Sequence, residues 1–110
     1  MEFDSEVLHF YTHNCNEEDI IQTIKKLNEY RLDVLCHRYF NDFEFFVVRD
    51  GLSPSWSDVQ VEVQNILGQN IGQHSFSLMN VHIVVNKDKR SVFKNYGTGN
   101  DVVVEENFGI

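Results

Sequence analysis

Two short segments of the chain carry residue types that could hold a metal ion. The segment YTHNCNEED, residues 11–19, has His13 two positions before Cys15, and LCHRYF has Cys36 directly before His37. Structural zinc sites need about four ligands and usually repeat a short Cys–Cys or His–His spacing, which neither segment has. Successive strand residues point to opposite faces, so Cys36 and His37 could not bind one ion together. We therefore predict no metal site and no cofactor, and we assign both cysteines to packing.

A second group of candidate residues consists of histidines and a tyrosine in predicted strands. In VLHFYTH, His9, Tyr11 and His13 alternate with apolar residues, so they share one strand face. His82, in FSLMNVHIVVN, would stand near His9 or His13 if the two strands were neighbours. Such a cluster could bind a ligand or titrate near neutral pH. We interpret these four residues as sheet histidines and a tyrosine that pack or meet a partner, with ligand binding as the alternative.

Three patterns that are typical of catalysis, nucleotide binding or RNA binding are incomplete in this chain. No serine, cysteine or acid is placed by the sequence to complete a nucleophilic set with His9, His13 or His82, so we predict no enzymatic activity. The loop YGTGND, residues 96–101, lacks the lysine of a P-loop and precedes a strand-like acidic run, which is typical of a turn. Aromatic residues occur without the alternating basic residues that RNA-binding sheet faces use.

The elements that must position these residues follow from hydrophobic periodicity. Asn16 suits a helix N-cap, acidic residues follow it, and Ile20, Ile24 and Leu27 recur at helical spacing. A second stripe begins after Ser55, so the predicted helices cover residues 16–31 and 55–69. Alternating or wholly apolar runs predict strands over residues 7–13, 32–40, 43–50, 76–86, 91–96 and 101–108.

This order of elements predicts the fold. We expect an α+β fold: a ferredoxin-like βαββαβ sandwich with an extra C-terminal β-rich tail. Right-handed crossovers would place the two helices on one face of an antiparallel sheet. The first strand would then be central, with the last strand of the repeat beside it. We find no linker that divides the 110 residues, so residues 1–110 are predicted to form one globular domain.

The charge balance excludes some partners and favours others. The chain has 17 acidic and 9 basic residues and a formal net charge of −8. Direct nucleic-acid binding is not expected, because it depends on lysine and arginine displacing counterions from phosphates. No apolar run is long enough for a membrane span and no signal peptide precedes the first strand, so we expect a cytoplasmic location without a membrane partner.

The acidic residues are the predicted partner-binding surface. They occur before the first strand, at the start of the first helix and in the tail, and would merge into one negative surface if the tail paired beside the first strand. An aromatic residue of the tail could supply an apolar anchor within this surface. The predicted partner-binding residues are Glu2, Asp4, Glu17, Glu18, Asp19, Asp101, Glu105, Glu106 and Phe108.

We therefore interpret the chain as a small acidic inhibitor protein that binds and blocks a basic protein partner, such as a nuclease. In general character it resembles immunity proteins that neutralise nuclease toxins, and phage anti-defence proteins. The alternative is a small-molecule-binding or sensory ferredoxin-like domain that acts as a homodimer. A small enzyme built on His9, His13 or His82 is a third hypothesis, which the missing nucleophilic set disfavours.

Overall fold

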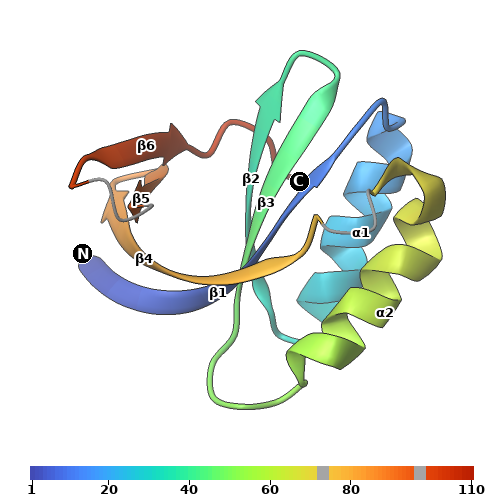
Figure 1. Ribbon diagram of the computed structural model, residues 1–110, viewed down its shortest axis with the longest axis horizontal. Helices are drawn as coiled ribbons and strands as arrows, with labels where there is room; N and C mark the ends of the chain where they lie inside the picture. Colours follow the sequence, from blue (N-terminus) through green and yellow to red (C-terminus); the bar gives the residue numbers. More distant parts are fainter. Residues whose placement is uncertain (72–74, 96–98) are drawn as a thin grey trace.

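The structure, a computed structural model, describes residues 1–71, 75–95 and 99–110. Six strands and two helices follow one another along the chain, and a short 3-10 turn, η1, ends the second helix (Figure 1). The glycine loop YGTGND lies partly outside the described residues. The bounds are β1 Glu2–Thr12, α1 Glu17–Glu29, β2 Asp33–Tyr39, β3 Asp42–Val48, α2 Trp56–Leu67, η1 Gly68–Asn70, β4 Ser77–Asn86, β5 Lys89–Asn95 and β6 Asp101–Glu105.

All six strands form one antiparallel sheet in the order β2-β3-β1-β4-β5-β6. Figure 1 shows α1 and α2 side by side on one side of the sheet, while β4, β5 and β6 curl away from them to form a half-barrel. The predicted α+β class is confirmed, and so is the central position of β1, which pairs with β3 and β4. Within the described residues, neither helix has the length and apolar character needed to cross a bilayer.

The predicted ferredoxin-like topology is wrong in its finer form. The sheet does not end at β4, because β5 and β6 continue it as an antiparallel meander and the six strands curl together. The chain was expected to add only a β-rich tail to a two-layer sandwich. A sheet of this many twisted strands gains from curling, because its concave face can then bury apolar side chains against one another.

The helices begin where the capping residues predict. Asn16 Oδ1 accepts a hydrogen bond from the Glu18 amide at 2.9 Å, and Ser55 Oγ accepts one from the Asp58 amide at 3.2 Å. Each cap satisfies an amide that has no partner within its own helix. The second helix ends at Gly68, whose φ of 42° is in the left-handed region that a glycine adopts without strain.

Two hydrophobic cores lie on opposite faces of the sheet. The first lies between the helices and the sheet, where Ile20 and Val63 pack over Phe10 and Phe45. The second lies inside the half-barrel and has Phe46 among its buried residues. Strand β3 serves both cores, because Phe45 and Phe46 point to opposite faces, which explains why its sequence is apolar on both sides.

The chain after β6 returns to the other end of the sheet and joins it to β2. The amides of Asn107 and Phe108 both donate to the Cys36 carbonyl, at 3.2 and 3.3 Å. Arg90 holds this segment in place: its Nε and Nη2 donate to the Glu106 carboxylate at 3.1 and 2.5 Å, and its Nη1 donates to Asp33 at 2.6 Å. One guanidinium therefore links β5, the tail and the start of β2.

Replacing Arg90 should weaken this link. We expect Arg90→Met to lower the free energy of unfolding by about 2 kcal/mol, because the partly buried Glu106 carboxylate loses a two-pronged, charged donor. The midpoint of urea unfolding measures the change. Lys89→Met is the control, because Lys89 is exposed and lies directly before Arg90 in β5. Equal loss of stability in the two variants would contradict the assigned role of Arg90.

Candidate functional site

A cleft of about 530 Å³ opens where the half-barrel is not closed. Its lining comes from β1, β2, β3, β5 and β6, so the cleft lies between the two end strands of the sheet, with β1 and β5 beneath it. Its walls are mostly aromatic and β-branched side chains, and several polar groups converge on it, which is typical of small-molecule sites. The lining residues are Tyr11, His13, His37, Tyr39, Asp42, Phe43, Glu44, Lys94, Val102, Val103 and Val104.

Three buried polar side chains meet at one oxygen: Glu44 and Lys94 at the floor of the cleft, and His9 beneath them. Glu44 Oε2 lies 2.6 Å from His9 Nε2 and 2.7 Å from Lys94 Nζ. The exposed fractions are 3% for His9, 7% for Glu44 and 4% for Lys94. The Lys94 ammonium also approaches the Tyr11 and Phe46 rings, at 5.9 and 5.7 Å from their centroids. Buried charges persist in an apolar interior only when they are paired in this way.

The Glu44 carboxylate is ionised throughout the physiological range. Burial alone would raise its pKa, but hydrogen bonds from His9, Lys94 and Tyr11, together with the positive charge of Lys94, outweigh that effect. They lower the pKa of Glu44 from 4.5 to about 2. Because the carboxylate accepts, His9 must donate from Nε2, and its Nδ1 then faces the Ser77 hydroxyl at 3.4 Å.

Strand register brings these residues together. Glu44 on β3 stands opposite Tyr11 on β1 and opposite His37 on β2. His9 and Tyr11 share the concave face because they lie two positions apart on β1, and their rings meet edge to face at 4.8 Å. Lys94 reaches the same point from β5, on the far side of the half-barrel.

Two histidines lie at the rim. His13 Nδ1 is 3.4 Å from Asp42 Oδ2, and His37 Nδ1 donates to the Glu105 carbonyl at 2.7 Å. The second contact joins β2 to the end of β6 and fixes the closed end of the cleft. Imidazoles at the rim can donate or accept, so the cleft offers a ligand polar groups at its mouth as well as at its floor.

The predicted ligand-binding residues separate into two groups. His9, Tyr11 and His13 lie at or below the cleft, whereas His82 does not. The expected proximity of His82 to His9 or His13 is wrong, because the β1–β4 register pairs His82 with Asp4, well along the strand from His9. His82 Nδ1 lies 2.7 Å from Asp4 Oδ1, and this hydrogen bond raises the pKa of His82.

Glu44, Lys94 and His37 were not predicted from the sequence as site residues. A usable signal was present for two of them. FEFFVV and SVFKNY each place one charged residue inside a strand of apolar residues, and the two charges have opposite signs. A lone charge in a buried strand needs a partner, so two such strands in one small domain indicate a buried ion pair.

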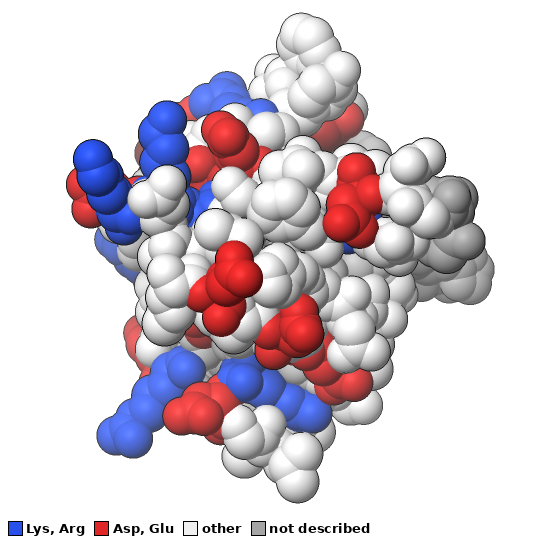
Figure 2. Space-filling model, turned by 90° about the vertical axis from the view of Figure 1, so that its left-hand side faces the viewer, with Lys and Arg blue, Asp and Glu red and all other residues white. Residues whose placement is uncertain are grey.

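The predicted partner-binding acids lie apart from one another. They were expected to form one negative surface if the tail paired beside the first strand. The tail strand β6 does not pair with β1, because β4 and β5 lie between them. Figure 2 shows acidic and basic side chains interspersed on the side of the molecule that carries the N-terminus and β4–β6. Several of the acids are held in ion pairs: Glu2 and Asp4 with His82, Glu17 with Arg38, and Glu106 with Arg90.

The other predicted partner-binding residues differ in exposure. Glu18, Asp101 and Glu105 are exposed and enter no ion pair within the part of the chain that the structure describes. Asp19 is half-buried in the first turn of α1. Phe108 was expected as an exposed anchor, and this is wrong: it is half-buried and packs edge to face on Phe43, with ring centroids 5.0 Å apart.

The two segments that each carry a cysteine and a histidine do not form a common site. Cys36 is buried in the core between helices and sheet, and burial raises the pKa of its thiol above the ordinary range. Cys15 is half-buried at the start of α1, and both thiols are free. Over residues 1–71, 75–95 and 99–110, no three His, Cys, Asp or Glu side chains are grouped to hold a metal ion.

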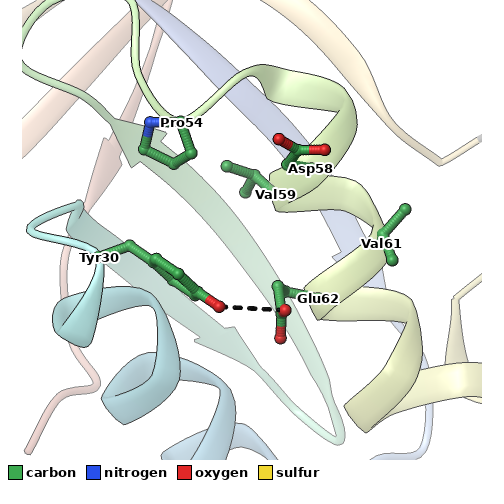
Figure 3. Close-up of a pocket in the computed structure, with 6 residues that line it drawn as sticks. All are labelled: Tyr30, Pro54, Asp58, Val59, Val61 and Glu62. Carbon is green, nitrogen blue, oxygen red and sulfur yellow. Dashed lines mark hydrogen bonds between the residues drawn. The ribbon is translucent and has the colours of Figure 1, made fainter.

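A second, smaller cavity of about 300 Å³ lies beside the helices, between the end of α1, the loop before α2 and α2 itself (Figure 3). Tyr30 and Pro54 face α2 across it, and the Tyr30 hydroxyl donates to Glu62 at 3.1 Å. The two carboxylates that line it, those of Asp58 and Glu62, are not buried. The cleft of the half-barrel is therefore the better candidate for a site.

Comparison of the chain with protein-family models, with curated proteins and with solved structures found no match. The geometry of the cleft is therefore the basis for the function proposed below.

The lowered pKa of Glu44 makes stability depend on acid pH. Its folded-state pKa of about 2 lies below its ordinary value of 4.5, so the stabilisation is complete above about pH 5 and is lost as the pH falls towards 2. The wild-type protein should lose about 3 kcal/mol more of its unfolding free energy over this range than Glu44→Gln, which cannot titrate. Urea unfolding at a series of pH values measures both. Parallel pH profiles would contradict a buried, ionised Glu44.

Proposed function

We propose that this protein binds a small, mainly apolar molecule in the cleft between the β2–β3 hairpin and β6. The observation that supports this most directly is a cleft of about 530 Å³ with apolar walls above a buried, hydrogen-bonded cluster of Glu44, Lys94 and His9. This volume is within the range that ligand pockets usually have. A buried polar cluster at the base of an apolar cavity is costly for a fold that needs only stability.

The two parts of the cleft would have separate roles in binding. The walls, which include Tyr39, Val102 and Val104, would supply most of the binding free energy, at roughly 25 cal/mol for each Å² of apolar surface removed from water. The polar floor would orient the ligand, because Lys94 and Tyr11 are held in place by Glu44 before any ligand arrives. Little ordering of side chains would then oppose binding.

Binding fits this cluster better than catalysis. A general base works best when its pKa lies near the working pH, and a carboxylate whose pKa is lowered to about 2 accepts protons poorly. Glu44 accepts hydrogen bonds from His9 and Lys94, so the part we propose for it is to hold these two side chains in place. The proposal is therefore a binding or sensory domain without a reaction of its own.

A bulky side chain in the cleft should abolish binding. Val102 lines the cleft and is 46% exposed, so Val102→Trp can fill the space without disturbing a core. Leu78→Trp is the matched control, at an outward position of the same sheet that is 52% exposed. A thermal-shift screen with neutral, anionic and cationic aromatic fragments should yield hits whose affinity falls at least about tenfold in Val102→Trp and is unchanged in Leu78→Trp. Fragments whose affinity is the same for Val102→Trp as for the wild type would refute the proposal.

The second candidate function is binding of a basic protein partner, as the sequence predicted. The observation that favours it is the net charge of −8, which would speed encounter with a positive surface. In this case Glu18, Asp101 and Glu105 would carry the interaction, because they are exposed and outside the ion pairs. Glu106 would not, because its carboxylate is engaged by Arg90.

This second candidate makes its own prediction. The immobilised protein should retain basic proteins from a cell extract at low ionic strength and release them as salt rises, because screening weakens exposed charges. The triple change Glu18→Lys, Asp101→Lys and Glu105→Lys should slow association with any such partner at least about tenfold. Lys25→Glu, an exposed change of opposite sign, is the control. An extract that yields no basic protein would argue against this function.

A further inference from the structure

The two charged groups at the floor of the cleft compensate each other. At the floor, the Glu44 carboxylate lies 2.7 Å from the Lys94 ammonium, so the pair carries no net charge. At the rim, Asp42 lies 3.4 Å from His13 Nδ1, and its other oxygen accepts from the Asn14 amide at 3.4 Å. Each carboxylate that lines the cleft is thus already engaged by groups of the protein itself.

A charged ligand would upset this balance. An anion placed at the floor would meet Lys94 but also the Glu44 carboxylate beside it, in a molecule whose net charge is −8. A cation would meet the Lys94 ammonium, and it could reach Glu44 only by competing with Lys94 and His9. Either ion would leave water without gaining an equivalent counter-charge, and this desolvation is costly in an apolar site.

The walls favour a flat ligand. The cleft lies between the two end strands, with Tyr39 on the β2 side and the β-branched residues Val102 and Val104 on the β6 side. The Tyr11 ring lies at its base, edge-on to His9. Aromatic rings fit between such walls, since they pack on aliphatic side chains and gain edge or stacking contacts with the two tyrosines.

From these observations we infer that the ligand of the cleft is an uncharged aromatic compound. The self-compensated pair of Glu44 and Lys94 selects against ions, and the aromatic and β-branched walls select for a planar ring. This inference rests on the proposed function, because it specifies the class of molecule that the same cleft binds.

Three probes of one shape and different charge test the inference. Naphthylmethanol, naphthoate and naphthylmethylammonium share the ring and are neutral, anionic and cationic at neutral pH. Isothermal titration of the whole protein should show naphthylmethanol binding at least about tenfold more tightly than either ion. Val102→Trp should remove the binding of naphthylmethanol, whereas Leu78→Trp should keep it, which places the probe in the cleft.

Charge-changing variants of the floor sharpen the test. Glu44→Gln leaves the Lys94 charge uncompensated, so the preference should move towards naphthoate by at least about tenfold relative to the wild type. The double variant Glu44→Gln with Lys94→Met removes both charges and should again prefer naphthylmethanol. The double variant keeps the test decisive if Glu44→Gln alone fails to fold. Circular dichroism confirms that each variant remains folded.

The outcomes separate the inference from the proposed function. Tighter binding of naphthoate or naphthylmethylammonium by the wild type would overturn the inference and leave a ligand-binding cleft. If none of the three probes binds, the charge of the fragment hits that Val102→Trp removes decides the matter, and predominantly ionic hits would overturn the inference. An absence of any hit sensitive to Val102→Trp would overturn the proposed function itself.

Discussion

The shared carboxylate of Glu44 is the interaction on which the half-barrel and its cleft depend. It draws the His9 imidazole from β1 and the Lys94 ammonium from β5 to one oxygen, with 2.6 and 2.7 Å contacts. The sheet must curl for these strands to meet across its concave face, because β4 lies between them in the strand order. An ion pair removed from water stabilises only a geometry that brings its partners together, so the pair favours the curled sheet over a flat one. Apolar side chains fill the rest of the concave face.

The sequence was sufficient where local chemistry decides the structure. Asn16 and Ser55 cap the two helices as predicted, and the apolar stripe through Ile20, Ile24 and Leu27 faces the core. These features act over a few residues, so periodicity and capping preferences identify them. The double-sided β3 was also predicted, because Phe45 and Phe46 are adjacent in the sequence and both are buried. The central position of β1 followed instead from the order of elements and right-handed crossovers, and the pairing of β1 with β3 and β4 confirms it.

The sequence did not predict which strands pair or in which register, because these depend on contacts between residues far apart in the chain. Strand β6 could pair beside β1 or beside β5 with the same alternation of residues, and only the complete sheet distinguishes the two. Because β6 pairs with β5, Asp101 and Glu105 lie away from the acids of β1, and Val102–Val104 line the cleft. His82 was misplaced for a related reason. Alternation predicted which face of β4 carries His82 but not its position along β1. The β1–β4 register places His82 opposite Asp4. Periodicity was therefore enough to predict the fold class and the residues that β1 contributes to the cleft, His9 and Tyr11, but not the strands that complete the cleft.

The cleft exists because the two end strands of the sheet are kept apart along part of their length. The edge of β2 is occupied: the Cys36 carbonyl accepts from two tail amides, and the Asn107 side chain both accepts from the Arg38 amide at 2.6 Å and donates to the Arg38 carbonyl at 3.0 Å. A side-chain amide thus replaces a neighbouring strand, which protects an exposed edge from pairing with another chain. It also prevents β6 from closing onto β2 beyond Glu105, where His37 makes the last cross-contact. The Asn107 side chain that protects the edge of β2 therefore also leaves open the space in which a ligand would lie.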